Sequence, residues 1–280
     1  MKKLGIVGAG IMGSDIAQLA AQSGFEVILF DIDENKSRAA FEKIQERLKR
    51  YASKGKIPPD QVGKTTSKIK LHTSIDDLAV ADIVLECVPE DLALKKDVFR
   101  QLSRVCKAGT VLASNTSSMS ITEIASATDC PESVIGIHFL NPARVMKLIE
   151  IIPGLKTTRE TVEMAKTIVK KLGREHVESR DFPGFLLNRM LYPLINESIY
   201  LLYEGAGTPE NIDKVTRIGL NLPMGPLALA DMIGLDVILA VGEEMHKGFA
   251  DPKCRPCPLL RKYAAGGYLG VKTRRGFYIY

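Results

Sequence analysis

A glycine-rich string near the N-terminus restricts the fold of this chain more than any other feature. The string GAGIMG at 8–13 follows the short apolar run 3–7 (KLGIV) and opens a segment with helical spacing of apolar residues. A buried strand, a tight glycine turn and a helix, in that order, are typical of the start of an open parallel α/β sheet. The sequence therefore predicts a sheet whose first strand ends at this turn.

The same turn predicts a dinucleotide site. The first glycine permits the tight turn, the second lets a pyrophosphate approach the backbone, and the third lets the helix pack on the strand. A second apolar run, 26–30 (EVILF), ends at an aspartate whose carboxylate would accept hydrogen bonds from ribose hydroxyls and repel a 2′-phosphate, so we expect NAD rather than NADP. The alternative is a glycine turn that binds no ligand. The predicted cofactor residues are Gly8, Gly10, Ile11, Met12, Gly13 and Asp31.

Apolar runs and helical spacings alternate through the rest of the first half of the chain. A polar helix is expected at about 34–51, followed by a loop at 53–63 (SKGKIPPDQVG). Strands joined by helices favour a Rossmann-type α/β domain with a mostly parallel sheet. The further runs expected as strands are 82–88, 110–114 and 133–138, and the helical spacings are 91–106 and 120–127.

The pattern changes after about residue 180. The stretch 181–205 is expected as one long helix with Pro183 near its start, and helices follow at 208–218 and 226–247. Apart from a candidate short strand at 277–280 (FYIY), no strand pattern is clear after about residue 180. The sequence therefore predicts an all-α C-terminal domain. The predicted domains are 1–182, which binds NAD and includes a helical excursion at about 34–66, and 183–280, which is helical.

Positive charge is concentrated in one segment. The whole chain has 38 Lys and Arg against 33 Asp and Glu, a net charge of +5. Eleven basic and four acidic residues lie within 34–70, which gives this segment +7 and the remainder −2. The excess fits either a solvated helical face or a site for a polyanionic ligand, and it does not by itself indicate nucleic acid.

The cysteines favour a reducing, cytoplasmic environment, because there are five of them and they are scattered. Cys254 and Cys257 form a CxxC pair between prolines without a second pair, so we expect loop thiols rather than a zinc site. The start of the chain is interpreted as a strand and turn rather than a secretory signal. The apolar stretch 218–242 contains Asn221, two prolines and Asp231, so we do not expect it to span a membrane.

His138 ends the apolar run 133–138, the position beyond a strand where ligands bind in open α/β sheets. An Asn-Pro turn follows, and a second apolar run, 147–151, carries Glu150 back towards the histidine. Oxidation of an alcohol by NAD releases a hydroxyl proton, which an imidazole can accept near neutral pH. A buried carboxylate at the other ring nitrogen would fix the tautomer and stabilise the imidazolium. We therefore predict that the two side chains meet as a catalytic acid/base pair.

Two further polar groups are candidates near this pair. In the cluster 114–120 (SNTSSMS), one hydroxyl is expected to cap the next helix and another to hold a substrate oxygen. Asn188 lies among apolar residues of the long predicted helix, where its amide needs hydrogen-bond partners. A core hydrogen bond and a substrate contact fit that position equally well.

Five strings of the chain resemble signatures of the L-3-hydroxyacyl-CoA dehydrogenase family, in the family's order. The resemblance covers nearly the whole chain and is nearest to the stand-alone 3-hydroxybutyryl-CoA dehydrogenases of that family. The strings HFLNPARVMKLIE and DFPGFLLNR are the most specific parts of it. The five strings are 5–31, 114–121 (SNTSSMSI), 136–151 (GIHFLNPARVMKLIEI), 180–197 (RDFPGFLLNRMLYPLINE) and 222–236 (LPMGPLALADMIGLD).

The resemblance implies roles for individual residues. His138 matches the catalytic base and Glu150 its partner, while Ser117 matches the serine that hydrogen-bonds the substrate oxygen. Asn188 matches the asparagine near the reacting carbonyl. The residues implied at the nicotinamide half of the cofactor site or at the closing cleft are Glu90, Lys95, Asn115 and Lys272.

The resemblance also gives the basic segment a role, contact with the nucleotide of coenzyme A, for which Ser53 and Lys54 are the best candidates. Residues 184–280 resemble the family's dimerisation domain, so the resemblance implies that the helical domain 183–280 carries substrate and dimer contacts. The string GVKTRRGFY departs from the family, because Arg274 and Arg275 stand where a Gly-Glu type pair is common. This departure would alter the surface or the cofactor affinity rather than the chemistry.

Residues and resemblance together predict an enzyme that reversibly oxidises (S)-3-hydroxyacyl-CoA, of short chain, to 3-ketoacyl-CoA with NAD. It is expected to be a cytoplasmic homodimer of fatty acid and butanoate metabolism, without a metal, nucleic acid or membrane partner. One alternative is a gulonate-type sugar-acid dehydrogenase of the same superfamily, which the basic segment disfavours. The other is a non-catalytic dinucleotide-binding protein, which the complete set of polar site residues disfavours.

Overall fold

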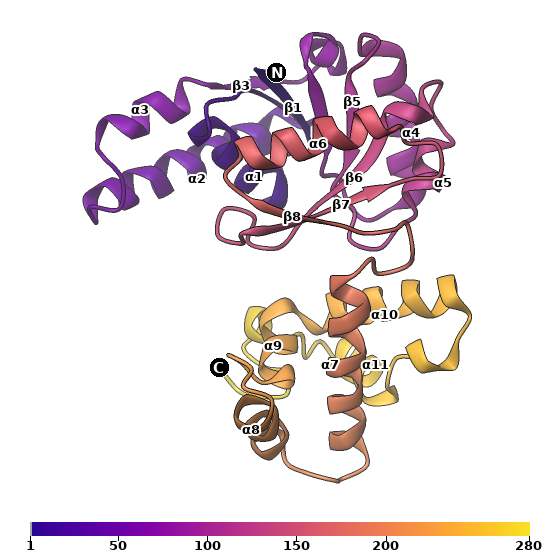
Figure 1. Ribbon diagram of the computed structural model, residues 1–280. Helices are drawn as coiled ribbons and strands as arrows, with labels where there is room; N and C mark the ends of the chain where they lie inside the picture. The colour runs from indigo at the N-terminus through magenta and orange to yellow at the C-terminus, as the bar shows by residue number, and fades with distance from the viewer. Residues whose placement is uncertain (1) are drawn as a thin grey trace. The chain divides into compact units, whose positions relative to one another are not determined.

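Residues 2–280 are described by a computed structural model, which divides into two compact units, one ending at Asp181 and the other comprising Phe182–Tyr280 (Figure 1). The division lies one residue before the boundary expected from the sequence. The first unit contains an eight-stranded sheet, and the second is built around five α-helices.

The sheet of the first unit has the strand order β3-β2-β1-β4-β5-β6-β7-β8. Neighbouring strands run parallel except β6 and β7, which are antiparallel, so the predicted mostly parallel α/β sheet is confirmed. Because β1 lies between β2 and β4, the strand order reverses beside it, and a ligand cleft is expected at the carboxyl ends there. The strands are β1 (Lys3–Val7), β2 (Glu26–Phe30), β3 (Ile69–His72), β4 (Ile83–Glu86), β5 (Val111–Ser114), β6 (Val134–Phe139), β7 (Leu148–Pro153) and β8 (Glu175–Glu178).

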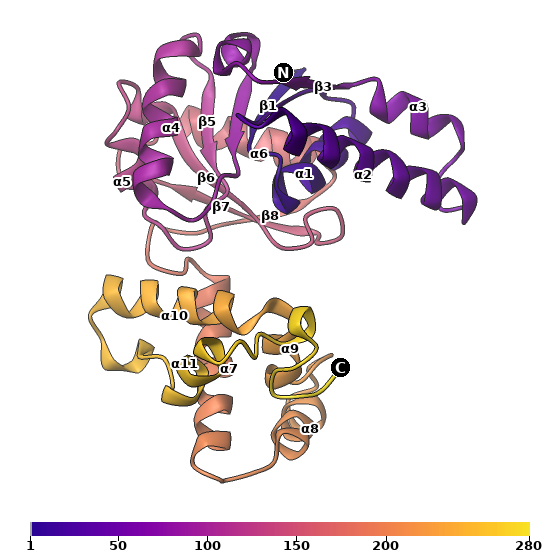
Figure 2. The same ribbon diagram turned by 180° about the vertical axis from the view of Figure 1, so that it is seen from behind.

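Helices cover both faces of this sheet. One core combines apolar residues of α1, α2 and α6 with alternate residues of the strands, as the two-residue period of a strand requires. In Figure 2, α4 lies in front of the sheet and α6 behind it. The helices of this unit are α1 (Ile11–Gln22), α2 (Glu34–Ser53), α3 (Asp60–Thr66), α4 (Leu92–Val105), α5 (Ile121–Ala125) and α6 (Arg159–Lys171).

The second unit packs its helices around a separate apolar core, which includes Tyr192, Ile195 and Leu227. Two buried aspartates fix the last residues of the chain to this core. Asp213 accepts a hydrogen bond from the Tyr278 hydroxyl, and Asp231 accepts bonds from the backbone of 277–278 and from the Tyr280 hydroxyl. The helices are α7 (Leu187–Tyr203), α8 (Pro209–Gly219), α9 (Pro226–Ile233), α10 (Leu235–Phe249) and α11 (Pro258–Ala265).

Several local predictions were wrong, and backbone conformation explains two of them. The long helix begins at Leu187 rather than near Pro183, because Gly184 and Phe185 have left-handed backbone with φ of 76° and 48°. The helix expected at 226–247 is divided into α9 and α10 at Gly234, whose φ is 111°.

The remaining differences involve short elements. The expected loop at 53–63 contains the first residues of α3, and the candidate strand at 277–280 forms only an isolated bridge between Arg275 and Ile279. The pattern analysis missed β3, β8, α6 and α11. Within residues 2–280, no helix has both the length and the apolar character needed to cross a membrane.

Candidate active site

His138 and Glu150 are cross-strand neighbours. The antiparallel pairing of β6 and β7 places them opposite each other, so both side chains project on the same face of the sheet. His138 Nδ1 lies 2.8 Å from Glu150 Oε2, and the two side chains are 6% and 1% exposed. The strand register alone therefore brings together the imidazole and the carboxylate that the sequence placed twelve residues apart.

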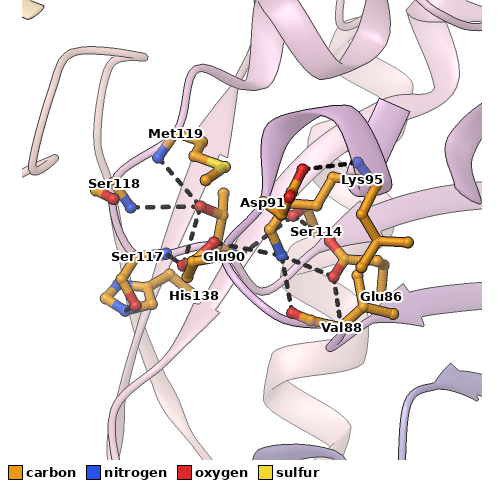
Figure 3. Close-up of polar contacts among 12 residues, drawn as sticks. Glu86, Val88, Glu90, Asp91, Lys95, Ser114, Ser117, Ser118, Met119 and His138 are labelled. Atoms are coloured by element: carbon orange, nitrogen blue, oxygen red, sulfur yellow. Dashed lines mark hydrogen bonds and ion pairs between the residues drawn. The ribbon is translucent and has the colours of Figure 1, made fainter. Parts of the chain in front are cut away.

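Ser117 contacts the other ring nitrogen of the histidine. Its Oγ lies 3.1 Å from His138 Nε2. Both residues are labelled in Figure 3. The carboxylate at Nδ1 favours the tautomer with a proton on that nitrogen, which leaves Nε2 as an acceptor for the serine hydroxyl. The arrangement can accept a proton at Nε2 and stabilise the resulting imidazolium through Glu150.

The polar cluster 114–120 forms the loop between β5 and α5. Ser120 is the N-cap of α5 and accepts from the backbone N–H of Glu123, so the predicted cap is confirmed. The Asp181 carboxylate accepts hydrogen bonds from the Ser120 hydroxyl and from the N–H groups of residues 121 and 122. These bonds fix the end of the loop that carries Ser117.

A cleft of about 840 Å³ opens at the carboxyl ends of β1, β4 and β5. No described atom would lie within 4 Å of a Cβ on Gly10, whereas a Cβ on Gly13 would overlap the Gly8 carbonyl oxygen. No described side chain caps α1, so its first-turn N–H groups are available to an anion. These features fit the pyrophosphate of a dinucleotide. Predicted site residues that line the cleft are Gly8, Gly10, Ile11, Met12, Asp31, Glu90, Lys95, Asn115 and Ser117.

Asp31 is held at the end of β2 by the backbone. Its Oδ2 accepts from Ala9 N at 2.9 Å and its Oδ1 from Asp33 N at 3.0 Å. The remaining lone pairs of this carboxylate can accept ribose hydroxyls. Beside it, Ile11 and Ile32 are 77% and 88% exposed and line the cleft, where they can cover a flat ring; the sequence reasoning missed Ile32.

Lys95 was expected beside the cofactor, but its ammonium is directed into a buried ion-pair cluster. The residue is 1% exposed, with Nζ 2.7 Å from Glu86 Oε1 and 3.3 Å from Glu90 Oε2. Asn115 Oδ1 accepts a hydrogen bond from Phe139 N on the neighbouring strand. Sequence reasoning missed Glu86; the only signal was a carboxylate at the end of a strand buried on both faces.

Four further predicted residues belong to the second unit or to the end of α2. Asn188 and Lys272 belong to the second unit, where Lys272 Nζ pairs with Asp236 at 2.5 Å. Ser53 and Lys54 are exposed at the end of α2, and Ser53 Oγ donates to the Arg50 carbonyl. Within the described residues, no cluster of three or more His, Cys, Asp or Glu could hold a metal ion.

The chain matches two family models that together cover nearly all of it. Residues 3–182 match "3-hydroxyacyl-CoA dehydrogenase, NAD binding domain", and residues 184–280 match the C-terminal domain of the same family. Among curated proteins, a "Probable 3-hydroxybutyryl-CoA dehydrogenase" of Bacillus subtilis is 48% identical over 100% of this chain and 98% of its own length. A 3-hydroxybutyryl-CoA dehydrogenase of Bradyrhizobium diazoefficiens is 47% identical over 100% of this chain and 96% of its own.

A solved structure extends the comparison to three dimensions. The crystal structure of (S)-3-hydroxybutyryl-CoA dehydrogenase from Ralstonia eutropha is 43% identical to this chain, with a TM-score of 0.96 and coverage of 100% and 99% of the two chains. The chain therefore belongs to the 3-hydroxyacyl-CoA dehydrogenase family, whose NAD-binding and C-terminal domains it carries in that order.

Proposed function

We propose that this protein reversibly oxidises (S)-3-hydroxyacyl-CoA to 3-ketoacyl-CoA with NAD, with a preference for short chains such as 3-hydroxybutyryl. The observation that carries the proposal is the series of contacts from Glu150 through His138 to Ser117. Ser117 also lines the dinucleotide cleft. The names of the relatives support the substrate class and the short chain.

Each residue of the site has a defined task in this reaction. NAD, when bound, supplies the acceptor for the hydride. His138 Nε2 takes the proton of the substrate hydroxyl, and Glu150 holds Nδ1 and stabilises the imidazolium. The Ser117 hydroxyl, next to Nε2, holds the C3 oxygen, and Asn188 is proposed to contact the same group. In the reverse direction the imidazolium returns the proton.

We assign the cofactor preference to Asp31. A 2′-phosphate would place two negative charges beside its carboxylate, whereas the ribose hydroxyls of NAD can donate to it. Glu90, Asn115 and the glycine loop are proposed to complete the cofactor site. Initial rates with NADH and NADPH in parallel test this assignment, and equal kcat/KM values would contradict it.

The Ser117–His138–Glu150 geometry also resembles the triad of a serine hydrolase. Such an enzyme would use backbone N–H groups near the nucleophile to stabilise an oxyanion. The N–H of Ser117 instead donates to the Glu90 carboxylate at 2.6 Å, so a negative charge occupies that position. This contact favours the dehydrogenase over the hydrolase.

The deciding experiment follows NADH absorbance with acetoacetyl-CoA and, separately, with free sugar acids and their keto products. We expect turnover with the thioester and none with the free acids. Turnover only with a sugar acid would support the gulonate-type alternative, and NADH binding without any turnover would support a non-catalytic role. A series of acyl-CoA chain lengths then defines the preferred substrate.

We also propose contacts with coenzyme A and with a second subunit that take no part in the reaction itself. The basic segment 34–70, with Ser53 and Lys54 at the end of α2, is proposed to contact the coenzyme A nucleotide. A homodimer is proposed through the helical unit, on which Val215 and Ile218 of α8 are 67% and 72% exposed. The five free cysteines support the expected cytoplasmic location.

A further inference from the structure

A fully buried carboxylate lies beneath the cleft and has no task in the proposed chemistry. Glu86 is the last residue of β4 and is 0% exposed. In the described chain, the lining of the cleft does not include it. An ionised carboxylate at such a position is retained only with several partners, because burial disfavours its charge.

Glu86 holds two loops together. Its Oε1 accepts from Val88 N and from Lys95 Nζ, both at 2.7 Å, and its Oε2 accepts from Ser114 Oγ at 2.7 Å (Figure 3). Ser114 Oγ in turn accepts from Thr116 N at 3.2 Å. One side chain therefore connects the loop after β4 with the loop after β5.

A second series of contacts leads from Lys95 to the catalytic pair. Lys95 Nζ lies 3.3 Å from Glu90 Oε2, and Glu90 Oε1 accepts from Ser117 N at 2.6 Å. The hydroxyl of Ser117 is the group that contacts His138 Nε2. Each link is a direct hydrogen bond or ion pair, so a shift of the lysine can displace the serine.

The cluster contains two carboxylates and one ammonium. Burial raises the pKa of Glu86, and the ammonium of Lys95 with the hydrogen bonds from Ser114 and Val88 opposes this rise. Burial also lowers the pKa of Lys95, but Glu86 and Glu90 more than offset this effect, so the pKa of Lys95 lies above its ordinary value. Lys95 is therefore charged and shared between a buried and a half-exposed carboxylate. Without the buried charge, Glu90 would be its sole counter-charge, and the ammonium would draw Glu90 away from Ser117.

We propose that Glu86 is a positioning residue for the reaction. By holding Lys95 it leaves Glu90 free to accept the N–H of Ser117, and that bond aligns the serine hydroxyl with His138. The inference rests on the proposed function for its kinetic consequence, although the alignment itself is a property of the resting protein.

The test compares Glu86→Gln, Lys95→Met and the double variant with acetoacetyl-CoA and NADH. The Gln side chain has nearly the same shape, and its Oε1 can still accept from Val88 N and Lys95 Nζ. Its Nε2 would donate to Ser114 Oγ where Glu86 accepts from it, so the substitution removes the charge and reverses one hydrogen bond. We expect Glu86→Gln to lower kcat by about tenfold or more, the order expected when a reacting group is misplaced by a fraction of an ångström. KM for acetoacetyl-CoA should change less than threefold, because Glu86 does not line the cleft.

The double variant tests whether Glu86 acts through Lys95. Its kcat should equal that of Lys95→Met, because Glu86 has no further effect once the lysine is neutral. It also leaves no unpaired buried charge, so it remains informative if Glu86→Gln does not fold. A further tenfold loss in the double variant, or a Glu86→Gln enzyme with normal kcat, would overturn the proposal.

Two controls separate positioning from general stability and from the proposed function. Asp82→Asn changes a carboxylate just before the same strand, where it accepts from the N–H groups of residues 2 and 3, and should leave kcat unchanged. Nitrogen-15 NMR of His138, one of four histidines, reports the Ser117 hydrogen bond without any substrate. If the unmodified protein has no activity but the His138 signals change in Glu86→Gln, only the proposed function is contradicted. If the His138 signals are the same in the unmodified protein and in Glu86→Gln, the positioning role of Glu86 is contradicted.

Discussion

The two ring nitrogens of His138 have different partners, and this difference defines what the residue can do. Nδ1 faces a buried carboxylate that is itself in the sheet, whereas Nε2 faces a serine hydroxyl on a loop. A strand side chain is held more rigidly than a loop side chain, so the Glu150 contact is expected to persist while the Ser117 contact adapts to a substrate oxygen. The nitrogen that is proposed to accept the proton is thus the one that faces the loop side chain.

The first prediction concerns His138→Gln. Loss of a general acid/base typically reduces the rate by about 10²–10⁴, so we expect kcat to fall at least about a hundredfold. NADH affinity, measured by fluorescence titration, should change little, because among residues 2–280 the cleft lining does not include His138. His176→Gln, on the exposed strand β8, is the matched control and should retain full activity. Normal turnover in His138→Gln would remove the imidazole from the mechanism.

The second prediction separates two glycines of one turn. Gly10 has an ordinary φ of −68° and open space at its Cβ position, so Gly10→Ala should fold normally but obstruct the pyrophosphate. We expect its NADH dissociation constant to rise about tenfold with an unchanged melting temperature. In Gly13→Ala the new Cβ would overlap the Gly8 carbonyl, so that variant should be destabilised instead. Equal effects of the two substitutions on stability would contradict this division.

At the level of elements, a buried aspartate of α1 joins three parts of the first unit. Asp15 Oδ1 pairs with Arg47 of α2, and its Oδ2 lies 2.9 Å from Arg144 Nη1 in the connection between β6 and β7. The Arg144 carbonyl accepts from Arg174 Nη2 just before β8. The helix that follows the glycine turn is therefore connected to the basic helix and to the strands that carry His138 and Glu150.

The third prediction follows from this connection. Asp15→Asn leaves two largely buried guanidinium groups without their counter-charge, so we expect a loss of about 3 kcal/mol in the free energy of unfolding. Urea denaturation measures this value. Asp97→Asn is the control, because its pair with Arg100 is about half exposed and should contribute less than about 1 kcal/mol. A loss in Asp15→Asn no larger than in the control would show that the connection is not stabilising.

The elements also show what sequence reasoning can recover. Buried parallel strands such as 26–30 and 133–138 are short apolar runs with glycine nearby, and a local pattern identifies them. The edge strands β3 (IKLH) and β8 (EHVE) are half polar, because one side of each lacks a neighbouring strand, so no apolar run marks them. The break at Gly234 was missed because the apolar period continues through it.

The residues of the site also differ in whether the sequence predicts them. His138, Glu150 and the glycine turn were predictable, because strand ends and turns place them through local sequence. Glu86 was not, because its pairing with Lys95 depends on how the loop after β4 folds back over the strand end. A residue whose partners are all non-local leaves no periodic signal in the sequence.

Over the whole molecule, the five cysteines occupy environments that suppress thiol chemistry. All five are free, and burial raises the pKa of each of them, with that of Cys106 raised to about 11. A folded-state pKa above the unfolded value favours the protonated thiol in the folded protein. The resulting contribution to stability is complete at neutral pH and is lost as the pH rises above about 9, where thiols of the unfolded chain ionise.

The fourth prediction is that iodoacetamide modifies the native protein slowly at pH 8. Mass spectrometry should find all five cysteines unmodified in native protein under conditions that modify them fully in urea, because the thiolate is the reactive form. The urea concentration at the midpoint of unfolding should decrease as the pH is raised from about 8.5 to about 10. Rapid native labelling of Cys254 or Cys257 would contradict the protected environment assigned to the CxxC pair.

The antiparallel register of β6 and β7 determines which changes in sequence leave the His138–Glu150 contact intact. Because the His138–Glu150 pair is defined by which residues face each other across two strands, the eight-residue connection 140–147 can vary in length without separating them. A slip of one residue in the register, by contrast, would turn the carboxylate to the opposite face. A protein engineer could therefore transplant the pair into another sheet as a two-stranded cassette, with the connection chosen to suit the new host.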